Sequence, residues 1–201
     1  SSDVCSSDLL ISFFEEHVQD LTIEELPLTY GAVACDLTSG REVWLKSGPV
    51  LEAVRASIAL PGLLTPLIQE ERVLVDGGLV NPVPVSMCRA LGADIVIGVN
   101  LNGDLMSNVR PRAELEGNFA DEKLGLLEVV GRSINVMQDR ITRSRLAGDP
   151  PEIMFQPLLG SFGLLDFHRA DEGIEEGVRC VQRMQGAVDQ LKKLVEENRG
   201  F

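Results

Sequence analysis

The sequence is poor in positive charge, in histidine and in aromatic residues. Its 201 residues include 18 Lys and Arg against 31 Asp and Glu, for a net charge of −13, with two His and 4% aromatic residues. This argues against nucleic acid as a partner, because phosphate binding requires clustered Lys and Arg. It also argues against attachment to anionic lipid by charge alone. The 44% hydrophobic and 24% charged residues are typical of one globular domain with a sizeable core.

Cysteines and long apolar runs are also scarce. The four cysteines are scattered, with neither a Cys-x-x-Cys pair nor a histidine cluster beside them: Cys5, Cys35, Cys88 and Cys180. This pattern predicts free thiols in a reducing, cytoplasmic compartment, with no disulfide framework, no metal site and no cofactor. Every apolar run is far shorter than the roughly 20 residues that span a bilayer, so no transmembrane segment is expected.

The most informative stretch runs from residue 72 to residue 91. A short apolar run, Val73-Leu74-Val75, ends at a carboxylate, Asp76, and Gly77 and Gly78 follow at once. Glycines at this point let backbone or substrate approach the carboxylate closely, or let the turn adopt positive φ. The alternative is an Asp-Gly turn without chemistry, since this dipeptide is a strong turn signal by itself.

A helix is expected directly after this turn. Asn81 is placed to cap it, Pro82 to occupy its first position, and Gly92 to end it after Leu91. The nearly continuous apolar run at 93–100 then predicts a parallel strand covered on both faces. Strand, helix and strand together indicate a βαβ unit.

The remaining pattern predicts an α/β chain. Its expected elements are a helix at 9–20, a capping box at 22–25, a hairpin of strands 31–37 and 42–45, a helix at 50–57, a loop at 58–66, a helix at 121–147, a strand at 153–156 and a helix at 169–199 that packs across the sheet. Residues 1–8 repeat Ser-Ser-Asp and are interpreted as a non-native or disordered terminus. Asp166-Phe-His168 is interpreted as a turn or helix cap rather than a proton relay or metal site.

Three segments, 54–66, 75–84 and 91–100, together resemble the patatin-like phospholipases, and their bacterial members most closely. The resemblance covers the chain from about Leu10 onward. It implies a three-layer α/β fold in which 9–101 is the C-terminal part of the catalytic domain and 102–201 is a helical extension with one short strand. It also implies a lipid or acyl-ester substrate, allows peripheral contact with a membrane, and implies no particular oligomeric state.

The same resemblance implies a catalytic role for Asp76. Family members hydrolyse acyl esters with a serine and aspartate dyad, and the aspartate lies in an Asp-Gly-Gly motif that Asp76, Gly77 and Gly78 match. Asp76 would be the general base, and the apolar residues before it are consistent with a partly desolvated carboxylate.

Two parts of the family pattern are missing from these residues. The sequence contains neither Gly-x-Ser-x-Gly, which would carry the nucleophile, nor a Gly-x-Gly-x-x-Gly loop for the oxyanion. A base without a hydroxyl to deprotonate does no chemistry, and loss of one oxyanion donor costs on the order of 10²–10³ in rate. The 201 residues alone are therefore expected to be inactive, as a chain from which the N-terminal half with the nucleophile is missing.

Two other classes of function stay open. A catalytically inactive binding or regulatory module would use a hydrophobic groove and predicts a large exposed apolar surface. A nucleotide-binding α/β domain would need a phosphate-cradling glycine loop, and the lack of one weighs against it.

Overall fold

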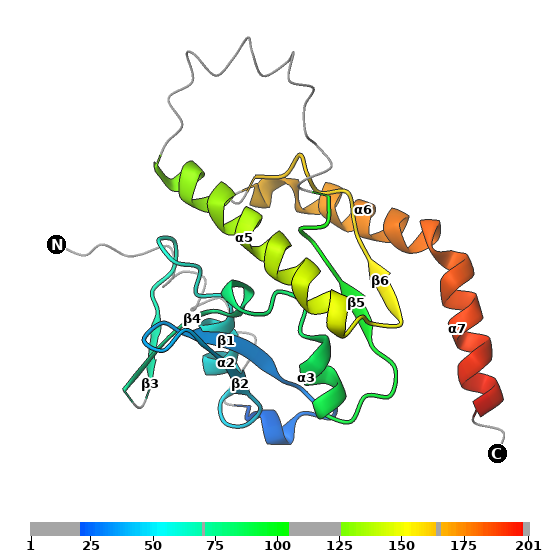
Figure 1. Ribbon diagram of the computed structural model, residues 1–201, viewed down its shortest axis with the longest axis horizontal. Helices are drawn as coiled ribbons and strands as arrows, with labels where there is room; N and C mark the ends of the chain where they lie inside the picture. The colour runs from blue at the N-terminus through cyan, green and yellow to red at the C-terminus, as the bar shows by residue number, and fades with distance from the viewer. Residues whose placement is uncertain (1–20, 70, 105–125, 164–165, 199–201) are drawn as a thin grey trace, which may run out of the picture. The chain divides into compact units, whose positions relative to one another are not determined.

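The computed structural model describes residues 21–69, 71–104, 126–163 and 166–198 (Figure 1). It forms two compact units. Unit 1 contains the described residues up to 93 together with 140–148, and unit 2 contains those of 94–139 and from 149 onward. The predicted helix at 9–20 and the terminus at 1–8 lie outside the described residues.

Unit 1 contains an antiparallel sheet of four strands. In spatial order these are β2 (Arg41–Leu45), β1 (Ala32–Asp36), β4 (Arg72–Asp76) and β3 (Leu67–Gln69). Strand β1 lies between β2 and β4, so that Cys35 is opposite both Glu42 and Val75. The predicted hairpin and the strand before Asp76 are confirmed, whereas β3 was not expected.

Small side chains let a helix lie close to this sheet. Helix α2 (Val50–Ser57) packs on β1 and β4, and Ala34 and Ala56 are both fully buried where they meet. Alanine has no side-chain entropy to lose on burial, which makes such a close contact favourable. The predicted helix at 50–57 is therefore confirmed, and its buried face covers the strand that leads to Asp76.

The predicted capping box at 22–25 is present and lies at the start of the described part of unit 1. A short 3₁₀ helix, η1 (Ile23–Glu25), begins after Thr22, whose backbone N–H donates to the Glu25 carboxylate at 2.9 Å. The carboxylate satisfies a donor that has no partner within the helix. Ile23 is buried and packs in the core with Ala32 and Val50.

The helix after the Asp-Gly-Gly turn is shorter than predicted. A 3₁₀ turn, η2 (Gly77–Leu79), comes first, and helix α3 (Val85–Ala90) begins three residues after Pro82. The expected capping role of Asn81 is wrong, because its side chain donates to Glu42 instead.

Unit 2 contains a two-stranded parallel sheet. Strand β5 (Ile97–Val99) pairs with β6 (Ile153–Phe155), so the predicted strands at 93–100 and 153–156 are both present. The predicted βαβ unit is wrong for the described residues, since β4 and β5 belong to different sheets. Cover on both faces is also wrong, because Ile97 and Val99 are 54% and 52% exposed.

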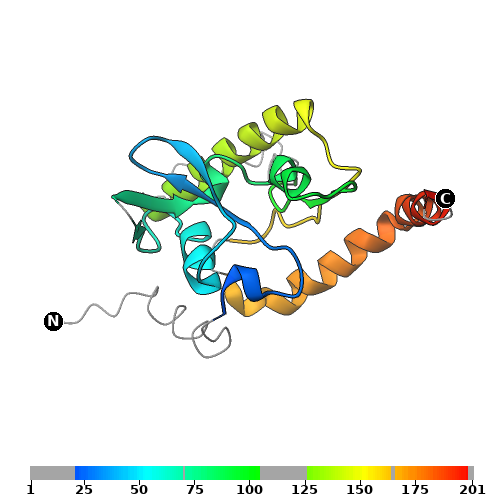
Figure 2. The same ribbon diagram turned by 90° about the horizontal axis from the view of Figure 1, so that it is seen from below.

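Three longer helices complete the described chain, namely α5 (Leu126–Gly148), α6 (Ala170–Arg183) and α7 (Gln185–Asn198), and a short 3₁₀ helix, η3 (Phe167–Arg169), precedes α6 (Figure 2). The predicted helix at 121–147 is confirmed in its described part. The single helix predicted at 169–199 breaks at Met184, just before Gly186, a residue with low helix propensity. Its predicted apolar face does not pack on a sheet: Ile174 and Val178 are exposed, and Glu176 and Cys180 are buried.

Carboxylates hold the loop before α6 in unit 2. The buried Glu176 accepts from the backbone N–H of Leu158 at 2.8 Å and from Arg179 and Arg183. These donors lower the pKa of Glu176 to about 2.

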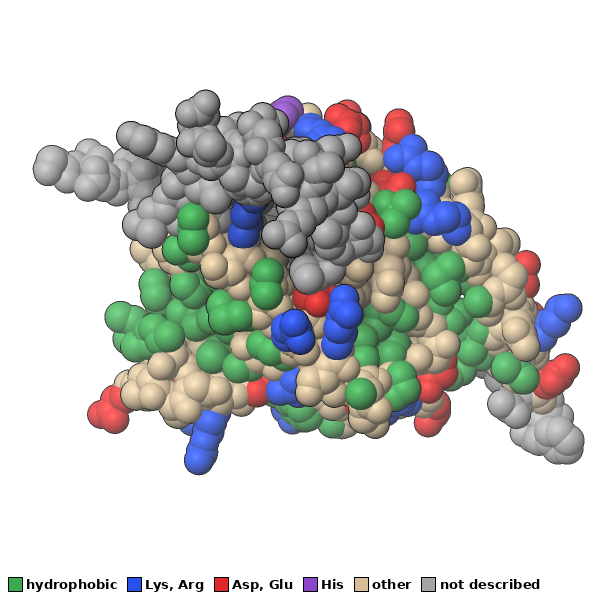
Figure 3. Space-filling view, turned by 45° about the horizontal axis from the view of Figure 1, so that its top comes forward, with side chains coloured by type: hydrophobic (Ala, Val, Ile, Leu, Met, Phe, Trp, Pro, Cys, Tyr) green, Lys and Arg blue, Asp and Glu red, His purple; other side chains and the backbone are tan. Residues whose placement is uncertain are grey.

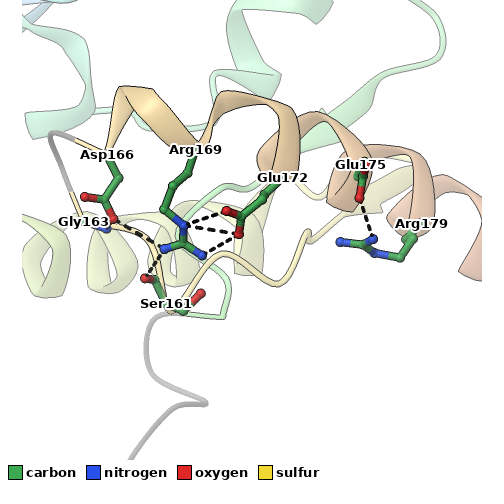
Figure 4. Close-up of polar contacts among 7 residues, drawn as sticks. All are labelled: Ser161, Gly163, Asp166, Arg169, Glu172, Glu175 and Arg179. Atoms are coloured by element: carbon green, nitrogen blue, oxygen red, sulfur yellow. Dashed lines mark hydrogen bonds and ion pairs between the residues drawn. The ribbon is translucent and has the colours of Figure 1, made fainter.

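Asp166 performs a similar task, as Figure 4 shows: it accepts from the Gly163 N–H at 2.9 Å and pairs with Arg169. Arg169 also pairs with Glu172 and donates to the Ser161 carbonyl at 3.0 Å. The interpretation of Asp166 as a turn residue fits these contacts.

Candidate functional site

Asp76 lies at the end of β4, where the sheet gives way to the η2 turn. Its backbone is fixed on both sides: it is opposite Ala34 in the register with β1, and its N–H donates to the Ala59 carbonyl at 3.0 Å. Two residues before it, Leu74 is 1% exposed, as is Val75. The Asp76 carboxylate therefore lies at the end of its strand, directly after two buried residues.

The turn is closed by its own hydrogen bonds. The Oδ1 atom of Asp76 accepts from the Gly78 N–H at 2.6 Å, so the side chain caps η2. The Gly77 carbonyl accepts from the N–H groups of Val80 and Asn81 at 3.0 and 2.8 Å. No hydrogen bond from any described residue reaches Oδ2 of Asp76, so one carboxylate oxygen is held and the other is available.

Gly77 is required by close approach and not by its φ angle. A Cβ built on Gly77 would overlap the carbonyl oxygen of Val33 and lie 2.6 Å from its carbonyl carbon. Neither Gly77 nor Gly78 is among the described glycines with positive φ. Of the two reasons that the sequence offered for glycine here, the structure thus selects the close approach of a neighbouring strand.

The environment of Asp76 favours its protonated form. Burial raises the pKa of this carboxyl above its ordinary value, and the hydrogen bond from the Gly78 N–H opposes that shift in part. A carboxylate whose pKa is raised toward neutrality is a better proton acceptor than an ordinary surface aspartate. The desolvated setting expected from the apolar residues before Asp76 is therefore present.

A second polar cluster anchors the far end of the same turn. The carboxylate of Glu42 accepts from the Asn81 side chain, from the Trp44 indole and from the Arg145 guanidinium, each at 2.7 Å. Asn81 is 3% exposed. We call these four residues the Glu42 cluster.

Sequence reasoning missed the Glu42 cluster. Glu42 and Asn81 are 39 residues apart, and Arg145 is 103 residues from Glu42. Local sequence patterns do not predict the pairing of Glu42 with Asn81 and Arg145, because it depends on how β2, the turn and α5 come together.

Within the described ranges, no serine hydroxyl donates to the carboxylate of Asp76; Ser39, for example, donates to Asp36 at 2.6 Å. The described residues contain no set of three His, Cys, Asp or Glu side chains arranged to hold a metal ion. The acidic residues Glu114, Glu116, Asp121 and Glu122, whose spacing in the sequence matches no metal signature, lie outside the described residues.

The described cysteines form no disulfide, and the described helices are not membrane spans. Cys35 and Cys180 are buried free thiols and Cys88 is half-buried, while Cys5 is outside the described ranges. None of the helices in the described ranges combines the length and hydropathy of a membrane span.

Comparison with known proteins gives consistent matches. The family model described as patatin-like phospholipase matches residues 2–89, a range that includes the Asp-Gly-Gly turn. An uncharacterized NTE family protein of Mycobacterium tuberculosis is 29% identical in an alignment 248 positions long, which covers 88% of this chain and 68% of that protein.

Two fungal lysophospholipases also match. One, from Neurospora crassa, is 28% identical over 81% of this chain and 12% of its own length. The other, from Pyricularia oryzae, is 30% identical over 78% of this chain and 11% of its own length. The similarity to these large proteins thus concerns one small part of each.

Proposed function

This chain belongs to the patatin-like phospholipase family, and from that premise we propose that it serves the hydrolysis of lipid acyl esters, with Asp76 as the general base. The observation that carries the proposal is the half-buried Asp76 carboxylate, oriented through one oxygen by the Gly78 N–H. The names of the fungal relatives, lysophospholipases, favour a lipid substrate. We further propose that residues 9–101 are the C-terminal part of a three-layer catalytic domain and that residues 102–201 are a helical extension.

In the proposed reaction, Asp76 accepts the proton of a serine hydroxyl while the serine oxygen attacks the ester carbonyl carbon. The proton then passes to the leaving alcohol. In the second step Asp76 takes a proton from water, whose oxygen attacks the acyl carbon, and returns it to the serine oxygen as the acid is released. The available Oδ2 atom suits this role because Oδ1 already holds its hydrogen bond to Gly78. Such a base contributes about 10²–10⁴-fold to the rate.

The serine and the oxyanion donors are proposed to come from residues outside these 201, which contain neither motif. Gly77 and Gly78 act by letting the turn approach β1 and by orienting the carboxylate. They are proposed as parts of the motif and not as groups that exchange protons. The 201 residues alone are proposed to be inactive.

The test compares hydrolysis of a short p-nitrophenyl acyl ester by two proteins. One is the 201-residue chain, and the other is a longer version of the same protein that includes a Gly-x-Ser-x-Gly segment. Each is made with Asp76 and as Asp76→Asn. We expect activity only in the longer protein, and a loss of at least about 10²-fold on substitution of Asp76.

Hydrolysis by the 201-residue chain, or full activity of the longer Asp76→Asn protein, would show that the nucleophile or the base has been misassigned. Substitution of Asp171 by Asn serves as the control, since this acidic residue lies in unit 2 and outside the motif.

A binding or regulatory module remains the second candidate function, supported by exposed apolar residues. Four hydrophobic side chains along and beside β5 are 40–57% exposed: Ile95, Ile97, Val99 and Leu101. Figure 3 shows further hydrophobic side chains, drawn in green, exposed at several places on the surface. Ligand binding by a longer protein that lacks esterase activity would favour this candidate.

A further inference from the structure

Glu42 collects donors from three separate segments of unit 1. Its Oε1 atom accepts from Trp44 on its own strand and from Asn81 beyond the η2 turn, and its Oε2 atom accepts from Arg145 in the last turn of α5. The side chain of Glu42 is 17% exposed and that of Arg145 is 40% exposed. Both carboxylate oxygens are therefore engaged in a largely enclosed place.

We propose that Glu42 is a positioning residue for Asp76, acting through Asn81. The register of β4 fixes the turn at Asp76, and the bond from Asn81 to Glu42 fixes it five residues later. Between these two anchors, the Asn81 N–H donates to the Gly77 carbonyl, which keeps the Gly78 N–H directed at the Asp76 carboxylate. The proposal deepens the proposed function, because the meaning of this geometry for catalysis rests on Asp76 being the base.

The chemistry of the cluster requires a carboxylate at position 42. Asn81 is almost fully buried, so its amide needs a partner, and leaving it without one is costly. An ionised carboxylate only accepts hydrogen bonds, so it serves Trp44, Asn81 and Arg145 at once. A glutamine has one acceptor oxygen and would present its own N–H groups to one of these donors.

Arg145 offsets the electrostatic cost of enclosing the Glu42 carboxylate. A largely enclosed carboxylate is unfavourable unless it is paired and hydrogen-bonded, and the guanidinium at 2.7 Å supplies the opposite charge. The ion pair joins β2 to α5. Glu42, which binds Asn81 of the turn, is therefore itself held in place by Arg145.

The test measures amide hydrogen exchange and the titration of Asp76 in the 201-residue chain. The variants are Glu42→Gln, which removes the acceptor for one donor, and Asn81→Ala, which removes the amide without changing any charge. Glu24→Gln is the matched control, because Glu24 is also a glutamate of unit 1 that accepts from a loop N–H, that of Gly48 at 3.0 Å.

The reporter amide is that of Gly78, and the reference is that of Leu37, which donates to the Val73 carbonyl at 2.8 Å within the sheet. In both test variants we expect exchange at Gly78 to accelerate by about tenfold, the scale of one lost hydrogen bond, with Leu37 unchanged. We also expect the pKa of Asp76, followed by carboxyl ¹³C shifts, to fall toward its ordinary value as water enters the loosened turn. Weakening of the Gly78 hydrogen bond would by itself raise this pKa, but burial is the larger of the two influences and its loss dominates. The control should change neither.

Unchanged exchange at Gly78, an unchanged titration of Asp76, or equal acceleration at Gly78 and Leu37 would each overturn the proposal, the last by showing only a general loss of stability. None of these measurements needs catalysis. Their failure is therefore distinct from failure of the proposed function, which the ester assay tests.

Discussion

The backbone of Gly77 lies against the carbonyl group of Val33, so closely that a single added methyl group would overlap its oxygen. Val33 is in the central strand β1 and Gly77 follows the proposed base directly. The close contact therefore fixes how far the turn that carries Asp76 stands from the sheet.

Substitution Gly77→Ala should destabilise the fold, because the obstacle is backbone of a central strand and cannot move aside as a flexible side chain would. Overpacking of this kind costs roughly 1–3 kcal/mol. Urea unfolding followed by circular dichroism measures the difference. Gly148→Ala is the matched control, since a Cβ at the end of α5 meets nothing within 4 Å, and an unfolding free energy that is equal for the two variants would contradict the prediction.

Substitution Asp76→Asn should stabilise the fold near neutral pH. Burial raises the folded-state pKa of Asp76, so its ionisation opposes folding: the stability present below the unfolded pKa is reduced as pH rises through the folded pKa. Asparagine keeps an oxygen for the Gly78 N–H and removes the charge. Unfolding free energies of both proteins from pH 3 to pH 8 should converge at the acid end and separate above it. A less stable variant at pH 7 would show that burial is not the dominant influence on this carboxyl.

Glu176 should make unit 2 sensitive to acid. Its folded-state pKa is lowered to about 2 from an ordinary 4.5, so its contribution is present above about pH 4.5 and is lost as pH falls toward 2. Exchange at the Leu158 N–H, which donates to this carboxylate, should accelerate over that range. Glu176→Gln should remove the pH dependence, whereas Glu175→Gln should retain it, because Glu175 is 71% exposed and has a single weak ion pair at 3.4 Å. Acid sensitivity that persists in Glu176→Gln would point to a different group.

The exposed apolar side chains of β5 should bind a hydrophobic dye. Double substitution of Ile97 and Val99 by Ser should reduce dye fluorescence with little loss of stability, because both side chains are more than half exposed. Ile153→Ser in the paired strand is the contrast, since Ile153 is 5% exposed and should lower the melting temperature. Unchanged fluorescence in the double variant would place the dye-binding surface elsewhere.

Local pattern was sufficient where neighbours in sequence are also neighbours in space. The hairpin of β1 and β2, the capping box at Thr22, helix α2 and the strand ending at Asp76 each depend on alternation, turn residues or caps within about ten residues. The Asp-Gly-Gly motif likewise identified the carboxylate together with the family. Its assigned role as base stays a prediction.

Failures arose where a longer-range contact competed with the local signal. Asn81 has the composition of a helix cap, but its amide bonds to Glu42, and α3 begins later. A second failure has a local cause: the apolar spacing at 174–195 indicated one long helix, which instead breaks at Met184, just before Gly186, and leaves Ile174 in solvent. Local propensity is a weak preference of a few tenths of a kcal/mol per residue, and one buried hydrogen bond outweighs it.

The sequence by itself determined the hairpin of β1 and β2, helix α2 and the place of the Asp76 carboxylate, because strand, turn and helix signals are short-range. Only the tertiary structure decided the partners: which strand β5 pairs with, why residue 77 has no side chain, and that Glu42 holds Asn81 with the help of Arg145. These pairings join residues up to 103 positions apart, and their energies exist only once the chain has folded around them.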